Sequence, residues 1–158
     1  MINKLALLSL ALLFIAGCSV PSKGVNIYFY DKEGKLYSVV RERPTIEEPL
    51  VIAMDQLLAG PTEQESAKGL TTLIPQGTRA RKVEIEGDTA IVDLNSVLHD
   101  FTGNAADARQ LITQIVYTAT SVKGVKQVMI KLQGSDQFTL GSENVLIDHP
   151  LSRDDVKS

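Results

Sequence analysis

The chain has few of the residues on which many small exported or catalytic proteins depend. Its 158 residues include one cysteine and no tryptophan, and aromatic residues make up 5% of the sequence. A single cysteine cannot form an internal disulfide, so the folded state must be stabilised by a hydrophobic core. With so few aromatic residues, that core must be mainly aliphatic.

Basic residues are also too few to indicate a nucleic-acid-binding protein. The chain has 16 Lys and Arg against 19 Asp and Glu, a formal net charge of -3. Affinity for nucleic acids comes largely from neutralising phosphates, so we expect no nucleic-acid partner. Arg79, Arg81 and Lys82 form one small basic cluster, which we interpret as a solvent-exposed strand edge. Contact with anionic headgroups or wall polymers is the alternative.

Motifs of the common hydrolases and phosphate-binding enzymes are absent from the sequence. His99 precedes Asp100, a pairing that suits a general base, but both lie in a predicted loop without a nucleophile. Asp88 and Asp93 flank a predicted strand, where paired carboxylates would suggest glycoside chemistry. Turn and strand-end roles fit them better. The two histidines, His99 and His149, match no compact metal site. We therefore expect no catalysis, no metal and no cofactor.

The N-terminal residues have the pattern of an export signal. Lys4 precedes a predominantly apolar run at residues 5–16, and Gly17 and Cys18 follow. The run is shorter than the roughly 20 residues that span a bilayer, and it matches the core of a signal peptide. Residues 15–18, Ile-Ala-Gly-Cys, resemble the lipobox of bacterial lipoproteins, in which the cysteine carries a diacylglycerol. An ordinary signal peptide with a chance cysteine is the alternative.

The lipobox implies a mature protein that starts at a lipidated Cys18. Residues 1–17 would be removed as the signal peptide, which takes away Lys4 and changes the net charge from -3 to -4. Residues 18–24 would form the lipidated end and a short tether. Since two or more acyl chains make a durable anchor, we expect attachment to the outer face of the cytoplasmic membrane.

Periodicity predicts pairs of strands that alternate with helices. The first helix starts at a capping box of Thr45 and Glu48, and the long second helix starts at Asn104 with Asp107. Apolar residues at steps of three and four along residues 105–122 give the strongest periodic signal. Thr62 with Glu65 predicts a further short helix. The predicted strands are residues 25–30, 36–43, 79–86, 89–94 and 125–132.

This order predicts one domain, residues 25–153, followed by a polar tail at residues 154–158. The expected class is α+β, a two-layer sandwich. Its sheet would be mostly antiparallel, with the two main helices packed on one face.

Six short segments occur in a characteristic order along the chain. They are LLAGP (57–61), LIPQGT (73–78), GDTAIVDL (87–94), QLITQIVYT (110–118), GVKQVMI (124–130) and HPLSR (149–153). Together they resemble the GerMN domain, which occurs in GerM-type sporulation and spore germination lipoproteins and in LpqB lipoproteins. The resemblance implies a non-catalytic extracytoplasmic module, similar in fold to the ring-building domains of secretion-type assemblies.

Together these observations predict a membrane-anchored extracytoplasmic binding or assembly module. Its role would be linked to sporulation, spore germination or organisation of the cell envelope. The expected partners are the membrane, through Cys18, and other envelope proteins or a second copy. The alternatives are a cell-wall-acting envelope enzyme and a small solute-binding lipoprotein. An enzyme would need convergent titratable groups, and solute-binding lipoproteins are usually larger and two-lobed.

Alternation along the strands predicts one docking surface. Successive side chains of a strand point to opposite faces, so Tyr28, Tyr30, Ile91 and Met129 would all point away from the helices. We expect these four to form a single open protein-binding patch, because aromatic residues and Met are enriched at interfaces. The alternative is that they are isolated apolar residues covered by the C-terminal segment.

Overall fold

The computed structural model describes residues 24–43 and 47–157. Cys18 and Thr45, on which two of the predictions rest, lie outside the described residues. The described elements are β1 (Gly24–Asp31), β2 (Leu36–Glu42), α1 (Pro49–Leu58), α2 (Glu63–Ala67), β3 (Leu70–Thr71), β4 (Ala80–Glu86), β5 (Thr89–Leu94), the 3-10 helix η1 (Ser96–Asp100), α3 (Ala105–Ala119), β6 (Gln127–Leu132), β7 (Phe138–Leu140), β8 (Val145–Ile147) and β9 (Leu151–Ser152).

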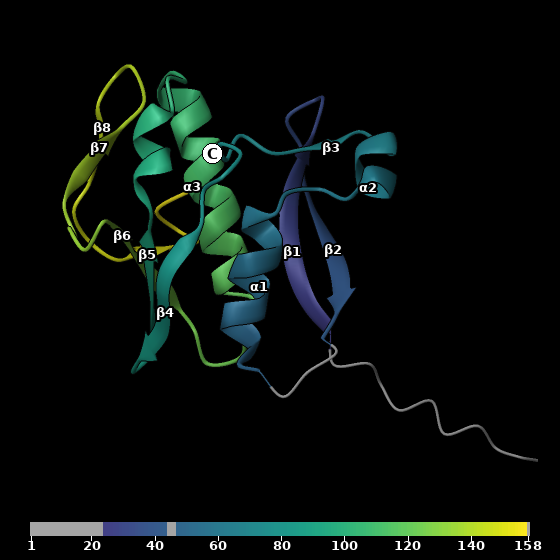
Figure 1. Cartoon of the computed structure of the whole chain (residues 1–158), viewed down its shortest axis with the longest axis horizontal. Coiled ribbons are helices and arrows are strands. Elements are labelled where there is room, and N and C mark those ends of the chain that lie inside the picture. Colours follow the sequence, from purple (N-terminus) through teal and green to yellow (C-terminus); the bar gives the residue numbers. More distant parts are fainter. Residues whose placement is uncertain (1–23, 44–46, 158) are drawn as a thin grey trace, which may run out of the picture.

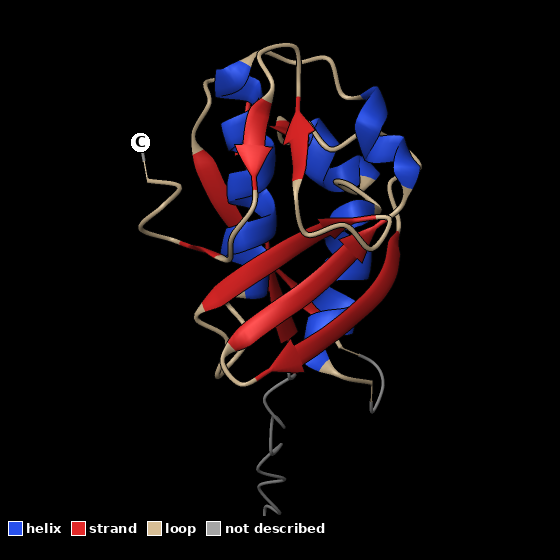
Figure 2. Ribbon diagram, turned by 90° about the vertical axis from the view of Figure 1, so that its left-hand side faces the viewer, coloured by secondary structure: helices blue, strands red, loops and turns tan. Residues whose placement is uncertain are grey.

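The described strands form two larger sheets and one small one. Their orders are β2-β1-β3, β4-β5-β6-β9 and β7-β8. Every pair is antiparallel except β5 with β6, and the connection between those two contains η1 and α3. Figure 1 shows α1 and α3 between the two larger sheets. Figure 2 shows the outer face of the four-stranded sheet, with helices behind it. The predicted α+β class is confirmed.

Helix starts follow the local sequence. The Asn104 side chain accepts a hydrogen bond from the Asp107 N–H, and Asp107 accepts one from the Asn104 N–H, so the predicted capping box is formed. The box of Thr62 and Glu65 is formed at α2 as well. Helix α1 begins later than predicted, at Pro49, with no side-chain cap at its N-terminus. Proline suits the first helical position because its missing N–H would have no partner there.

The core lies where α1 and α3 contact both sheets. Ile115 in the middle of α3 is 1% exposed, and its apolar neighbours three and four residues away are buried with it. The alternating residues predicted to face the helices on β1, β5 and β6 are all buried. They are Val25, Ile27, Phe29, Ala90, Val92, Leu94, Val128, Ile130 and Leu132.

Polar side chains of α3 take the place of a neighbouring strand along β1. The Thr118 hydroxyl accepts from the Tyr28 N–H at 3.1 Å, and the Gln114 amide donates to the Tyr28 carbonyl at 3.2 Å. Ser121, just beyond the helix, donates to the Asn26 carbonyl at 3.2 Å. Residues spaced by four and three share one side of a helix, so one stripe of α3 satisfies this edge of β1.

Gln114 also connects β1 to the segment that follows β3. Its side-chain oxygen accepts from the Thr72 hydroxyl at 3.2 Å and from the Leu73 N–H at 3.3 Å. The residue is 0% exposed, so none of these groups has water as an alternative partner at that amide. One buried amide therefore joins three parts of the fold.

A half-buried arginine secures the other side of the three-stranded sheet. Arg41 of β2 forms an ion pair with Glu65 of α2 and donates to the carbonyls of Gln56 and Gly60, both at 2.9 Å. Its guanidinium also lies 5.3 Å from the centre of the Phe29 ring. Arg41 therefore holds the end of α1, the start of α2 and the sheet together.

The same contacts set the ionisation of Glu65. Burial alone would raise the pKa of its carboxyl. The hydrogen bonds from Arg41 and from the Thr62 N–H, together with the charge of Arg41, outweigh burial and hold the pKa below its ordinary value. The folded state therefore favours the carboxylate, and folding stability becomes dependent on pH.

Replacing Gln114 with Leu should destabilise the domain. The change leaves the Tyr28 carbonyl and the Leu73 N–H without their partner, which costs about 1 to 3 kcal/mol. Denaturant unfolding of both proteins would measure it. Gln110→Leu, on the same helix at a half-buried position, should stay within about 0.5 kcal/mol of the parent. Equal effects of the two variants would contradict this role for Gln114.

Replacing Glu65 with Gln should cost stability at neutral pH but not in acid. The lowered pKa of Glu65 makes its stabilisation complete above about pH 4.3, the ordinary glutamate value. That stabilisation is lost as the pH falls through the folded-state pKa. We expect a difference of about 1 to 3 kcal/mol at pH 7 that shrinks towards pH 3. Glu63→Gln is the matched control on α2, and a pH-independent difference for Glu65→Gln would contradict the pair.

Candidate functional site

The described residues contain no group of three or more His, Cys, Asp or Glu side chains that could hold a metal ion. His99 and Asp100 lie at the end of η1 and are exposed. His149 contacts the neighbouring Asp148, with 2.6 Å between ring nitrogen and carboxylate, and is exposed as well. Neither histidine lies in an enclosed site.

The two carboxylates just before the start and near the end of β5, Asp88 and Asp93, stabilise the fold. Asp93 accepts from the Gly134 N–H at 2.8 Å and forms an ion pair with Arg81 at 3.2 Å. Asp88 pairs with Lys126 at 3.1 Å. The two acids are five residue steps apart along the strand, about 17 Å. The carboxyl groups of glycosidases lie within about 9.5 Å of each other, so this pair does not have their geometry.

The predicted basic cluster is largely neutralised. Arg81 pairs with Asp93, and Lys82 pairs with Glu84. Arg79 is exposed, and its guanidinium has no hydrogen bond or ion pair to the described part of the chain. Of the three basic residues, only Arg79 has a charge that no described acidic side chain neutralises.

The four residues predicted to form one patch lie on two different sheets. Tyr28 and Tyr30 are on β1, whereas Ile91 and Met129 face each other in the β5–β6 pair. The single patch is therefore corrected to two separate pairs. The physical reason is that α3, and not a strand of the other sheet, lies along the free edge of β1. Whether either pair binds a protein stays a prediction.

Tyr28 belongs to a cluster that the C-terminal segment covers. Its ring meets the Tyr117 ring of α3 edge to face, with centroids 5.4 Å apart. The Arg153 guanidinium lies 4.6 Å from the Tyr117 centroid and 5.6 Å from that of Tyr28. Arg153 also donates to the Thr120 hydroxyl at 2.8 Å and to the Tyr117 carbonyl at 3.2 Å. Tyr28 is therefore engaged within the domain.

Tyr30 lies beside a polar groove along the first half of α3. Burial raises the pKa of its phenol, although the hydrogen bond with Thr113 acts in the opposite direction. The groove of about 830 Å³ is lined by Arg109 and Gln110 of α3 and by Lys157 near the C-terminus. It is open and contains both charges, so its residues do not single out one ligand.

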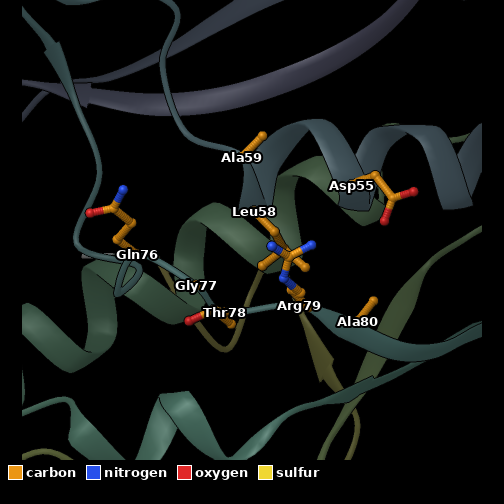
Figure 3. Close-up of a pocket in the computed structure, with 8 residues that line it drawn as sticks. All are labelled: Asp55, Leu58, Ala59, Gln76, Gly77, Thr78, Arg79 and Ala80. Atoms are coloured by element: carbon orange, nitrogen blue, oxygen red, sulfur yellow. The ribbon is translucent and has the colours of Figure 1, made fainter.

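An open pocket of about 450 Å³ lies between the end of α1 and the start of β4. Figure 3 shows Asp55 and Leu58 of α1, with Ala59 just after the helix, on one side and residues 76–80 on the other. Leu58 and Ala59 supply an apolar wall. Asp55 and Arg79 add one negative and one positive exposed group. Sequence reasoning missed this pocket, although segments 57–61 and 73–78 of the GerMN-like pattern meet there.

A rigid turn positions Arg79 at the pocket. Gly77 has a φ of 90°, a conformation that favours glycine, and the Thr78 N–H donates to the Pro75 carbonyl at 3.1 Å. Asn95 holds the turn from below: its amide donates to the Gly77 carbonyl at 3.0 Å and accepts from the Arg79 N–H at 3.1 Å. The backbone that carries Arg79 is therefore fixed before any partner arrives.

The pocket is suited to binding and offers no nucleophile. Thr78 is 2% exposed and its hydroxyl donates to the Pro75 carbonyl at 2.7 Å, so it does not face the pocket as a reactive group. What faces solvent is an apolar wall beside an arginine and an aspartate. Protein interfaces commonly combine apolar contacts with polar groups at their rim.

The family model described as "Germane: Sporulation and spore germination" matches residues 26–138. The chain belongs to this sporulation and spore germination family. The match includes the pocket, the β1 edge and all of α3. No curated protein matches the chain.

Three solved structures illustrate the similarity in fold. The first GerMN domain of the sporulation protein GerM from Bacillus subtilis is 20% identical with a TM-score of 0.69, covering 84% of this chain and 98% of that one. The tandem GerMN domains of the same protein give 20% identity and a TM-score of 0.67, but the chain covers 46% of that structure. A putative lipoprotein from Clostridium perfringens gives 19% identity and a TM-score of 0.59, with 84% and 88% covered. These likenesses show that the chain has the fold of a GerMN domain, in agreement with the family match.

Proposed function

We propose that this GerMN-type domain is a membrane-anchored extracytoplasmic module that binds other envelope proteins in sporulation or spore germination. The link to sporulation and spore germination comes from the family match. The observation that supports the binding role is the pocket at Arg79. There a turn held by Asn95 presents a guanidinium that has no partner among the described residues, beside an apolar wall.

The position of β1 supports the anchor. Cys18, in the lipobox-like residues 15–18, precedes the first residue of β1, Gly24, by six positions. Six extended residues span about 20 Å, so lipid at Cys18 would keep the domain close to the bilayer surface. Among the described residues, no helix has the length and apolar character to cross a membrane.

The roles of the titratable groups support binding without catalysis. Asp93 is held by Gly134 and Arg81, and Asp88 is held by Lys126, so these acids stabilise the fold. His99 and Asp100 are both exposed at the end of η1 and do not lie in an enclosed site. We therefore propose a non-catalytic module whose partner brings an apolar side chain and an acidic group to the pocket.

Replacing Cys18 with Ala should abolish anchoring. Without the thiol no diacylglycerol can be attached, and an uncleaved precursor should accumulate. Fractionation and the mobility of the protein on gels would measure both effects. Ser19→Ala keeps the cysteine and should behave like the parent. A Cys18→Ala protein that is processed and retained on the membrane like the parent would contradict the anchor.

Replacing Arg79 with Glu should weaken binding of the envelope partner. Reversing the charge places a carboxylate where the pocket now offers a guanidinium, and a loss of 1.4 kcal/mol already reduces affinity about tenfold. Crosslinking in intact cells, followed by quantification of the captured protein, would measure it. Arg109→Glu makes the same charge change on α3, away from the pocket, and should leave capture unchanged. Equal capture by the parent and Arg79→Glu would place the binding surface elsewhere.

A further inference from the structure

β2 is an edge strand, and its outer edge is open in the described part of the chain. It pairs with β1 in continuous register from Gly24↔Glu42 to Tyr30↔Leu36, and no described strand lies on its other side. Tyr28 directs its backbone groups to α3, so the alternate residues of β1 bond to β2. The backbone groups of Leu36, Ser38, Val40 and Glu42 therefore point outward from the sheet.

The other edges in the described part of the chain are short or protected. β4 has a register shift between Ala80 and Lys82, and it packs against α1. β3 and β9 have two residues each. Bulges, prolines, lysines and covering elements normally prevent pairing at an edge. β2, with the sequence LYSVVRE, has no bulge, proline or lysine.

The side chains along this edge also favour contact. Val40 is 70% exposed, more than the other exposed large hydrophobic residues of the described chain, and Tyr37 is 40% exposed. An exposed apolar residue at the centre of an open strand is the combination that pairing with another strand would bury.

We propose that a second copy of this chain pairs with β2, antiparallel, about a two-fold axis at Val40. Val40 then faces Val40 of the second copy, and Ser38 faces Glu42. Tyr37 faces Arg43. These pairs join apolar with apolar, hydroxyl with carboxylate and aromatic ring with guanidinium, all of which stabilise cross-strand contacts.

The charges along β2 favour an axis at Val40 over axes at Val39 or Ser38. An axis at Val39 would place Lys35 opposite Arg43, and an axis at Ser38 would place Lys35 opposite Arg41. Like charges directly opposite each other destabilise a strand pair. With the axis at Val40, three hydrogen-bonded residue pairs form, and they exchange about six main-chain hydrogen bonds.

This pairing rests on the proposed function and identifies one binding partner, a second copy of the chain. A dimer of this kind is compatible with chains that are anchored to one membrane. Gly24 lies opposite Glu42, two residues along the strand from Val40, so Gly24 of each copy would lie near the axis. A single strand pair buries less than the roughly 1,200 Å² of a standard interface. Confinement of both copies to one membrane raises their effective concentration, so the dimer should form there more readily than in dilute solution.

Disulfide crosslinking of the full chain in cell membranes tests the axis. In a hydrogen-bonded pair the Cα atoms are about 5.5 Å apart, which suits a disulfide. Val40→Cys should therefore give a covalent dimer at least about tenfold more efficiently than the parent, whose only cysteine is Cys18. Leu146→Cys is the matched control, because Leu146 is 51% exposed but lies on β8. It should stay at the level of the parent.

Mixed crosslinking tests the register. Two differently tagged copies, one with Ser38→Cys and one with Glu42→Cys, should crosslink when they are produced together, and neither should crosslink with itself. Adding Val40→Lys to both copies puts two like charges at the axis and should abolish the crosslink. Leu146→Lys in the same background should preserve it.

Two results would overturn the proposal: Val40→Cys crosslinking no better than Leu146→Cys, or no product from the mixed pair. Either result would leave the proposed function in place if the parent still captures other envelope proteins through Arg79. Crosslinking at Val40 without any other captured protein would support self-association and count against binding of other envelope proteins.

Discussion

The free edge of β1 would carry unpaired backbone groups if α3 did not lie along it. Gln114 and Thr118 bond to Tyr28, and Ser121 bonds to Asn26, so a helix ends the sheet where another strand would otherwise continue it. Because of this, the strands divide into two sheets with the helices between them. The same Gln114 holds the segment that leads to the pocket turn, and so links the fold to the candidate site.

Local patterns predicted most of the elements. The spacing of apolar residues gave α3, alternation gave the buried faces of β1, β5 and β6, and two capping boxes formed as expected. The division into two sheets was not predictable, because it depends on polar residues within an apolar helix pattern. Thr118 meets a strand 90 residues away, at Tyr28, and the periodicity of α3 contains no information about that partner. One predicted patch therefore became two separate pairs.

The arrangement of the candidate site could not be predicted from local sequence patterns either. The sequence places Arg79 and Arg81 in one basic cluster, but the structure gives them different roles. The irregularity between Ala80 and Lys82 brings Arg81 to Asp93, while Arg79 is held at the pocket by the turn. A bulge adds one residue to a strand and so changes which side chains point to each face of the sheet. Nothing in this sequence marks where the bulge occurs. The motifs at residues 57–61 and 73–78 could be recognised in the sequence, but their proximity in the folded domain could not be predicted from it.

The attachment of β1 to the N-terminal end of the chain has a mechanical consequence. A force applied through Gly24 along the strand acts at right angles to the hydrogen bonds between β1 and β2, because antiparallel bonds run across the strands. The bonds along the register from Gly24↔Glu42 to Tyr30↔Leu36 would then be loaded together in shear. They would not open one at a time, as they do when a hairpin is pulled apart from its end. Tension on this end of the chain is thus shared by the whole strand pair.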